Sequence, residues 1–150
     1  MPIAPQPPSA PDTATAHNSI TLNVLVALPA HTPLAAAPLH YLCSSPLPAG
    51  TLVRVPLGKR QVLGIVWDAT PASSNTAPET SNLKHIAEIL SDLPALDTTW
   101  RQLISFTARY YQRSMGEVAL AAQPPQLREL DAKQLARRLK TLAKNHATPR

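Results

Sequence analysis

Short runs of valine, leucine and isoleucine alternate with proline- and glycine-containing segments through the first half of the chain. The runs at 20–28, 39–43, 51–57 and 61–69 have the length and composition of β-strands. The last two flank a Gly-Lys-Arg turn, so they predict a β-hairpin with a basic tip. The segment 30–38 contains two prolines and is predicted as a loop.

The segment 83–94 has an ambiguous pattern. Its five apolar residues between Leu83 and Leu90 follow helical spacing, whereas strand-like alternation through Ile86 and Leu90 is weaker. The local pattern by itself therefore favours a helix.

Residues 97–113 show the clearest helical pattern, and Asp97 or Thr98 can cap the first turn. One stripe recurs at the spacing of a helix: Trp100, Leu103, Ile104, Thr107, Ala108 and Tyr111. We expect this stripe to face the core. Stacking of the helix aromatics on nucleic-acid bases is the alternative, but the spacing favours core packing for Trp100 and Tyr111.

Two further helices are expected towards the C-terminus. Residues 115–122 form a short one that the following Pro-Pro pair stops. Residues 129–144 form an amphipathic one, in which Leu135, Leu139 and Leu142 share a face and basic residues occupy much of the rest.

Charge is distributed unevenly along the 150 residues, whose formal net charge is +5. Residues 1–127 carry seven Lys or Arg and seven Asp or Glu, whereas residues 128–150 carry seven cations and two anions. The surplus therefore describes a basic tail that can bind a nucleic-acid backbone or an anionic surface, and not the folded body.

Composition excludes several classes of protein. The single cysteine, Cys43, cannot form an internal disulfide or a cysteine-rich zinc site, and the five histidines lack ligand spacing. No apolar run is long enough to span a membrane. The proline-rich start, residues 1–18, lacks the features of a secretory signal and is expected to be disordered. We expect a soluble, cytoplasmic monomer with no metal or cofactor of its own.

A string of motifs occurs in order along the chain and matches family patterns such as RVPFG…GIV and AxYYxxxxGEVLxxALPxxLR. The pieces are VALP (26–29), LHYLC (39–43), RVPLGKRQVLGIVW (54–67), LKHIAEIL (83–90) and, after Trp100, ARYYQRSMGEVALAAQPPQLR (108–128). Together they resemble the N-terminal 3′ DNA-binding domain of the bacterial primosomal protein N′ (PriA) family of replication-restart helicases.

The resemblance implies an α+β fold, a small antiparallel β-barrel-like sheet backed by helices. It also implies that 83–94 is a strand, because a small sheet needs closing. The expected units are a disordered leader (1–19), the 3′ DNA-binding domain (20–128) and a basic amphipathic linker helix (129–150).

The implied function is recognition of the 3′ end of the nascent leading strand at stalled replication forks. The implied partners are forked DNA and, through the longer family protein, other primosome proteins and single-stranded-DNA-binding protein. The phosphate-binding loop and zinc-binding cysteines of the helicase core are absent from this sequence. We therefore expect a fragment that is not an enzyme by itself; ATP, magnesium and zinc belong to the missing domains.

The resemblance also implies a binding site. Leu39, His40 and Tyr41 fall on the family's Phe-Asp-Tyr strand, where this chain replaces a stacking aromatic with Leu39 and a carboxylate with His40. That departure puts selectivity for a free 3′ hydroxyl in question, although neutral imidazole can still bond a hydroxyl. Core packing is the alternative role for Tyr41.

Gly58 and Lys84 match the family glycine and lysine that meet the DNA end. Gly58 permits close backbone approach, and a lysine ammonium suits a phosphate. Lys59 and Arg60 at the hairpin tip could pair with phosphates. The alternatives are a glycine that only serves the turn, a solvated Lys84 and an ordinary charged turn.

Arg109 and Arg113 could add a basic rim from the long helix, with less weight than the hairpin. A different class of function is also open. The neutral body would then be a scaffold, and the basic C-terminal helix would dock on a protein partner or an anionic membrane surface.

Overall fold

The computed structural model describes residues 19–29, 31–68 and 82–146. The leader expected at 1–18 and most of the polar segment 70–82 lie outside the described residues.

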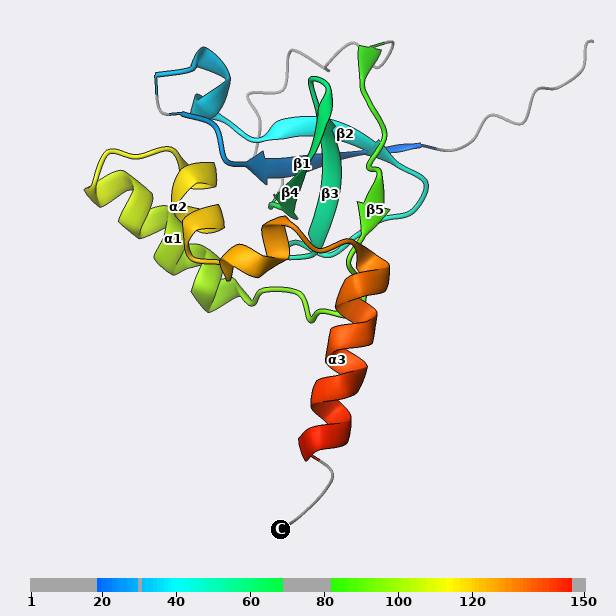
Figure 1. The fold of residues 1–150 in the computed structure, drawn as a ribbon. Coiled ribbons are helices and arrows are strands. Elements are labelled where there is room, and N and C mark those ends of the chain that lie inside the picture. Colours follow the sequence, from blue (N-terminus) through cyan, green and yellow to red (C-terminus); the bar gives the residue numbers. More distant parts are fainter. Residues whose placement is uncertain (1–18, 30, 69–81, 147–150) are drawn as a thin grey trace, which may run out of the picture.

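Five antiparallel strands form one sheet in the spatial order β2-β1-β4-β3-β5. The strands are β1 (Ile20–Val26), β2 (Leu39–Cys43), β3 (Leu52–Leu57), β4 (Arg60–Val66) and β5 (Glu88–Ile89). Figure 1 shows that the sheet is strongly curled, with helices gathered against one side. The expected α+β fold and the hairpin are confirmed.

Neighbouring residues of each strand point to opposite faces of the sheet. Both faces carry apolar residues. One face carries a buried cluster of Val24, Val26, Tyr41, Val53, Val55 and Val66. The other face contributes Leu25, Leu52, Leu63, Ile65 and Trp67 to a second cluster. The helices pack on this second cluster through Ile104, Leu120 and Leu135. The curled sheet therefore has a buried inner face and a helix-covered outer face.

The segment 84–89 pairs with β2 through its first residues and with β3 through its last two, which form β5. The amide of Leu42 in β2 donates to the carbonyl of Lys84 over 2.9 Å, and the amide of Ile86 donates to the carbonyl of Leu42 over 2.9 Å. A few residues later, β5 pairs with β3. The strand expected within 83–94 is confirmed and the helix suggested by periodicity is wrong, because pairing with two partners overrides a local pattern.

Helix α1 (Thr98–Tyr110) begins as expected, with the Asp97 side chain accepting from the amide of Trp100 over 2.7 Å. Ile104 and Ala108 are buried, but Tyr111 is 66% exposed. The expectation that the stripe faces the core is therefore wrong for Tyr111 and for Leu103, which is 58% exposed. The helix ends at Tyr110, and the positive φ of 52° at Gln112 turns the chain away from the helical stripe.

Two further elements surround α1. Helix α2 (Met115–Ala121) follows it and stops before the Pro-Pro pair, as expected. The segment predicted as a loop at 30–38 instead contains a short 3-10 helix, η1 (Pro33–Ala36). Proline fixes φ near the helical value and is favoured at the start of a helix. The prediction of a loop throughout 30–38 is therefore wrong for these four residues.

Helix α3 (Ala132–His146) follows the short 3-10 helix η3 (Pro125–Arg128). It starts later than the predicted residue 129 because Asp131 caps it: the Asp131 carboxylate accepts from the amide of Gln134 over 2.7 Å, and Gln134 accepts in return from the amide of Asp131. Leu135 is buried in the helix-side core, whereas Leu142 is 54% exposed. The helix thus begins on the body and then projects away from it (Figure 1).

A buried arginine ties η3 and α3 to the sheet. Arg54 of β3 is 7% exposed, and its guanidinium donates to the carbonyls of Leu127, Arg128 and Leu130. Its neighbour across the strands, Glu88, accepts from the amide of Ala132 over 3.2 Å. Arg54 and Glu88 of the sheet therefore hold the carbonyl end of η3 and the amide start of α3. The division of the chain at 128 stays a prediction.

Candidate functional site

A cavity of about 470 Å³ opens beside the hairpin turn. Its wall comes from the η1–β2 segment, the turn between β3 and β4, and the start of the segment 82–89, here called the closing segment, which pairs with β2 and β3. Five of the seven predicted binding residues lie on it: Leu39, His40, Tyr41, Gly58 and Lys84. Residues far apart in sequence are thus brought together at one place, and no Asp or Glu is among the residues that line it.

The cavity lies between β2 and the β3–β4 turn of the curled sheet. Because both backbone groups of Leu42 bond the 84–86 segment, alternation turns the amide and carbonyl of His40, two residues earlier, to the same edge. In the β1–β2 register His40 faces Asn23, whose carbonyl bonds Trp67 on the opposite side. The edge of β2 therefore presents backbone hydrogen-bonding groups towards the cavity.

Tyr41 contributes structure more than chemistry. It is 4% exposed, and its hydroxyl donates to the carbonyl of Pro56 over 2.9 Å. Burial raises the pKa of the Tyr41 phenol, so the hydroxyl stays neutral and engaged. The core packing considered for Tyr41 is what the structure shows, and this bond fixes β2 against the arm that carries Gly58.

Gly58 is the first residue of a two-residue turn, with a φ of 61°. A positive φ at the first turn residue and not at Lys59 is the pattern of a type II′ turn, which favours glycine there. A Cβ at Gly58 would meet no heavy atom within 4 Å. The turn therefore needs this glycine for its backbone conformation, and the space beside it is open.

Replacing Gly58 with alanine is expected to lower the free energy of unfolding by about 1–2 kcal/mol, because an L-residue is strained at this φ. Asparagine, which adopts positive φ more readily, should cost less. Urea unfolding of both variants followed by circular dichroism measures the difference. An alanine variant as stable as the unmodified chain would contradict the turn assignment.

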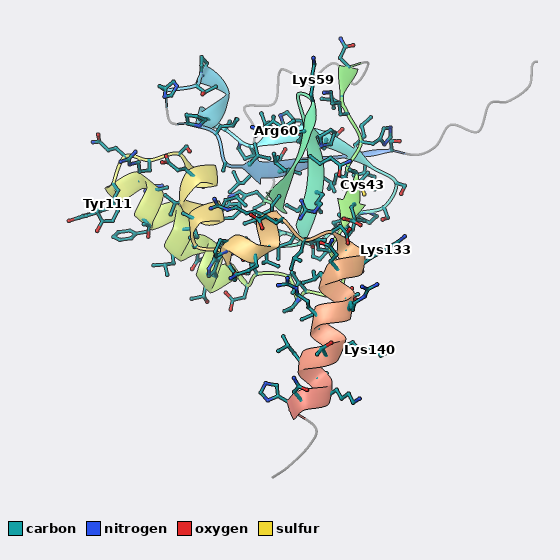
Figure 2. The ribbon with its side chains drawn as sticks, viewed as in Figure 1. Cys43, Lys59, Arg60, Tyr111, Lys133 and Lys140 are labelled. Carbon is teal, nitrogen blue, oxygen red and sulfur yellow. The ribbon has the colours of Figure 1, made fainter. Side chains whose placement is uncertain are left out.

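Lys59 and Arg60 lie at the tip of the hairpin and not on the cavity wall (Figure 2). Alternation along β4 places Arg60 on the same face as Val62, which packs on the inner cluster that also includes Leu57. Neither cation, nor Lys84, has an ion pair or side-chain hydrogen bond within the described ranges. Among the described residues, the cation on the cavity wall, Lys84, and the two at the hairpin tip are therefore not neutralised.

The other candidates lie elsewhere. Arg109 and Arg113 line a different cavity. Trp100 packs against the core, whereas Phe106, Tyr110 and Tyr111 are exposed at the far end of α1, where Figure 2 labels Tyr111. Sequence patterns did not point to Pro33 or Asn82, which help to form the cavity wall, because no local signal marks loop residues that meet only in the fold.

Within the part of the chain that the structure describes, no three His, Cys, Asp or Glu side chains are grouped as metal ligands would be. Nor does any described helix have the length and apolarity required to cross a bilayer. What the cavity offers chemically is an ammonium, an imidazole, backbone groups and apolar surface. Such a set is chemically suited to a polar, anionic ligand.

Comparison with known families agrees with this geometry. A family model described as the 3′ DNA-binding domain (3′BD) of PriA matches residues 23–124, which include every residue of the cavity wall. The match covers more than half of the chain and runs from within β1 to just past the end of α2. This chain belongs to the PriA 3′ DNA-binding domain family.

Proposed function

We propose that the cavity between β2, the hairpin turn and Lys84 receives the 3′ end of the nascent leading strand at a stalled replication fork. The chain would then act as the end-recognition module of a replication-restart helicase. The observation that supports this most directly is that five of the seven residues expected from the family resemblance line one cavity.

Each part of the wall has a role in this proposal. The ammonium of Lys84 pairs with the phosphate of the terminal nucleotide, since it has no other partner among the described residues. The ring or backbone of His40 bonds the terminal hydroxyl. Leu39 supplies apolar contact where an aromatic would stack. The volume of about 470 Å³ falls within the range of small-ligand pockets, roughly 300–1,000 Å³.

The alternative function places binding on α3, whose distal half carries exposed cations; Figure 2 shows Lys133 and Lys140 on this helix. Deleting α3 cannot separate the two proposals cleanly, because Leu135 and Leu139 of this helix pack on the core. Charge-removing substitutions in the full chain are therefore the better tool, and Arg137 and Arg138 are exposed.

The test is fluorescence anisotropy with two forks at two salt concentrations, one fork ending in a free 3′ hydroxyl and the other in a 3′ phosphate. Lys84→Gln is expected to weaken binding of the hydroxyl-ended fork about tenfold, equivalent to about 1.4 kcal/mol. It should also reduce the ratio between the two forks. The control is the double variant Arg137→Gln and Arg138→Gln, which should preserve that ratio.

Two outcomes would count against the proposal. Equal affinity of the unmodified chain for both forks would exclude end recognition by the cavity. Binding that ignores Lys84 and disappears in the Arg137 and Arg138 double variant would assign DNA binding to α3. If the chain instead bound acidic vesicles and not DNA, and the Arg137 and Arg138 double variant lost this binding, α3 would be assigned to a membrane surface.

A further inference from the structure

A second cavity, of about 650 Å³, lies on the other side of η1 from the first. Its wall comes from residues 31–35 and from the junction of α1 and α2. Pro33 lines both cavities, so η1 is the wall that they share. In Figure 1, the blue segment that contains η1 lies at the upper left, above the loop that joins α1 to α2.

The wall of the second cavity combines apolar residues with polar groups and two arginines. His31, Arg109 and Arg113 lie on its wall, and no carboxylate does. The Arg109 guanidinium has no hydrogen bond or ion pair within the described residues. Arg113 lies 3.6 Å from Glu117, but their side chains are 61% and 40% exposed. An exposed pair four residues apart stabilises by only about 0.3–0.5 kcal/mol, so Arg113 can exchange it for a stronger partner.

The two arginines come together because the chain reverses after α1. Gln112 has a φ of 52°, and the amide of Arg113 donates back to the carbonyl of Ala108 over 2.9 Å. An ordinary explanation would be that the arginines cap the C-terminus of α1. Neither guanidinium donates to a carbonyl among the described residues, so capping does not account for them.

We propose that this second cavity binds phosphates of the same DNA strand, immediately 5′ of the terminal nucleotide held in the first cavity. This inference rests on the proposed function. The strand would cross η1 at Pro33 and leave over Arg109 and Arg113. Guanidinium groups suit this role, because their planar donors bind phosphate oxygens in pairs. The ligand class is a phosphodiester backbone, read without regard to sequence.

The test compares 3′-hydroxyl single strands of two to eight nucleotides, with a matching 3′-phosphate series. The double variant Arg109→Gln and Arg113→Gln should keep the affinity of the unmodified chain for the dinucleotide. It should lose about tenfold for the longest strand, and the 3′-hydroxyl preference should remain. Two lost phosphate contacts should reduce the slope of log affinity against log salt by about 1.4.

The matched control is Arg137→Gln and Arg138→Gln, which removes the same charge from α3. It should not change the gain in affinity with strand length. Urea unfolding checks that the Arg109 and Arg113 variant is folded; little loss is expected, because Arg109 has no partner to lose among the described residues.

Three results would overturn the inference: no gain in affinity with length in the unmodified chain, the same gain in the Arg109 and Arg113 variant, or an equal loss at every length. If the proposed function were wrong, the experiment would give a different set of results. The unmodified chain would then bind 3′-hydroxyl and 3′-phosphate strands equally, while the variant would still remove the gain with length.

Discussion

Replacing Arg54 with alanine is expected to lower the free energy of unfolding by about 3–5 kcal/mol, as for other buried charged groups that lose one partner. The substitution leaves the carbonyls of Leu127, Arg128 and Leu130 without their donor in a site where Arg54 is only 7% exposed. Each unsatisfied buried carbonyl costs about 1–3 kcal/mol. Urea unfolding monitored by circular dichroism gives the change directly.

Two companion variants separate the carbonyl contacts from the ion pair. Arg54→Lys keeps the charge but cannot reach three carbonyls at once, so an intermediate loss is expected. Glu88→Gln should cost less than about 1 kcal/mol, because the Glu88 carboxylate lies 3.9 Å from Arg54 and is partly exposed. The amide side chain introduced by this substitution keeps an oxygen that can accept from the amide of Ala132. A larger loss for Glu88→Gln than for Arg54→Ala would show that the ion pair dominates.

Replacing Gly116 with alanine is expected to destabilise the chain by about 3 kcal/mol, at the upper end of what an overpacked core usually costs. A Cβ there would lie 1.9 Å from the carbonyl oxygen and 2.8 Å from the carbonyl carbon of Val26. Both atoms are backbone of β1, so no side-chain rotation relieves the overlap. Alanine gains about 1 kcal/mol of helix propensity, which does not offset it. Thermal or urea unfolding measures the net effect.

The control for Gly116→Ala is Ala121→Ser, a small change at an exposed position of the same helix, expected within about 0.5 kcal/mol of the unmodified chain. The hydroxyl of Ser114, the N-cap of α2, also donates to the carbonyl of Leu28, just after β1, over 3.2 Å. If Gly116→Ala unfolds like the unmodified chain, α2 can move from β1 at little cost.

The strands and α1 could be predicted from the sequence because their signals are local. Alternating apolar residues, the Gly-Lys-Arg turn and the Asp97 cap each act over a few neighbours. The closing segment could not be predicted from its own periodicity, since its conformation depends on pairing with β2 and β3. The resemblance supplied that strand. Burial of Tyr111 was predicted wrongly because the stripe was continued past the end of the helix.

The functional site, like the fold, could be predicted from the sequence only in part. Gly58 and Lys84 could be identified from motifs, and the fold brings them to one cavity. The role of Arg54 was missed, although a cation within the apolar run Leu-Val-Arg-Val is a signal that something polar must meet it. Its partners come from residues more than 70 positions away, which no local pattern reveals.

The closing segment also bears on self-association. An open sheet offers two outer strands whose free amides and carbonyls can template another chain, a common route to aggregation. Here the segment 84–89 pairs with both β2 and β3, so the stretch around His40 is where β2 turns backbone groups outward beside the cavity. A DNA end seated there would cover the same edge, and ligand occupancy would protect this domain from edge-to-edge pairing.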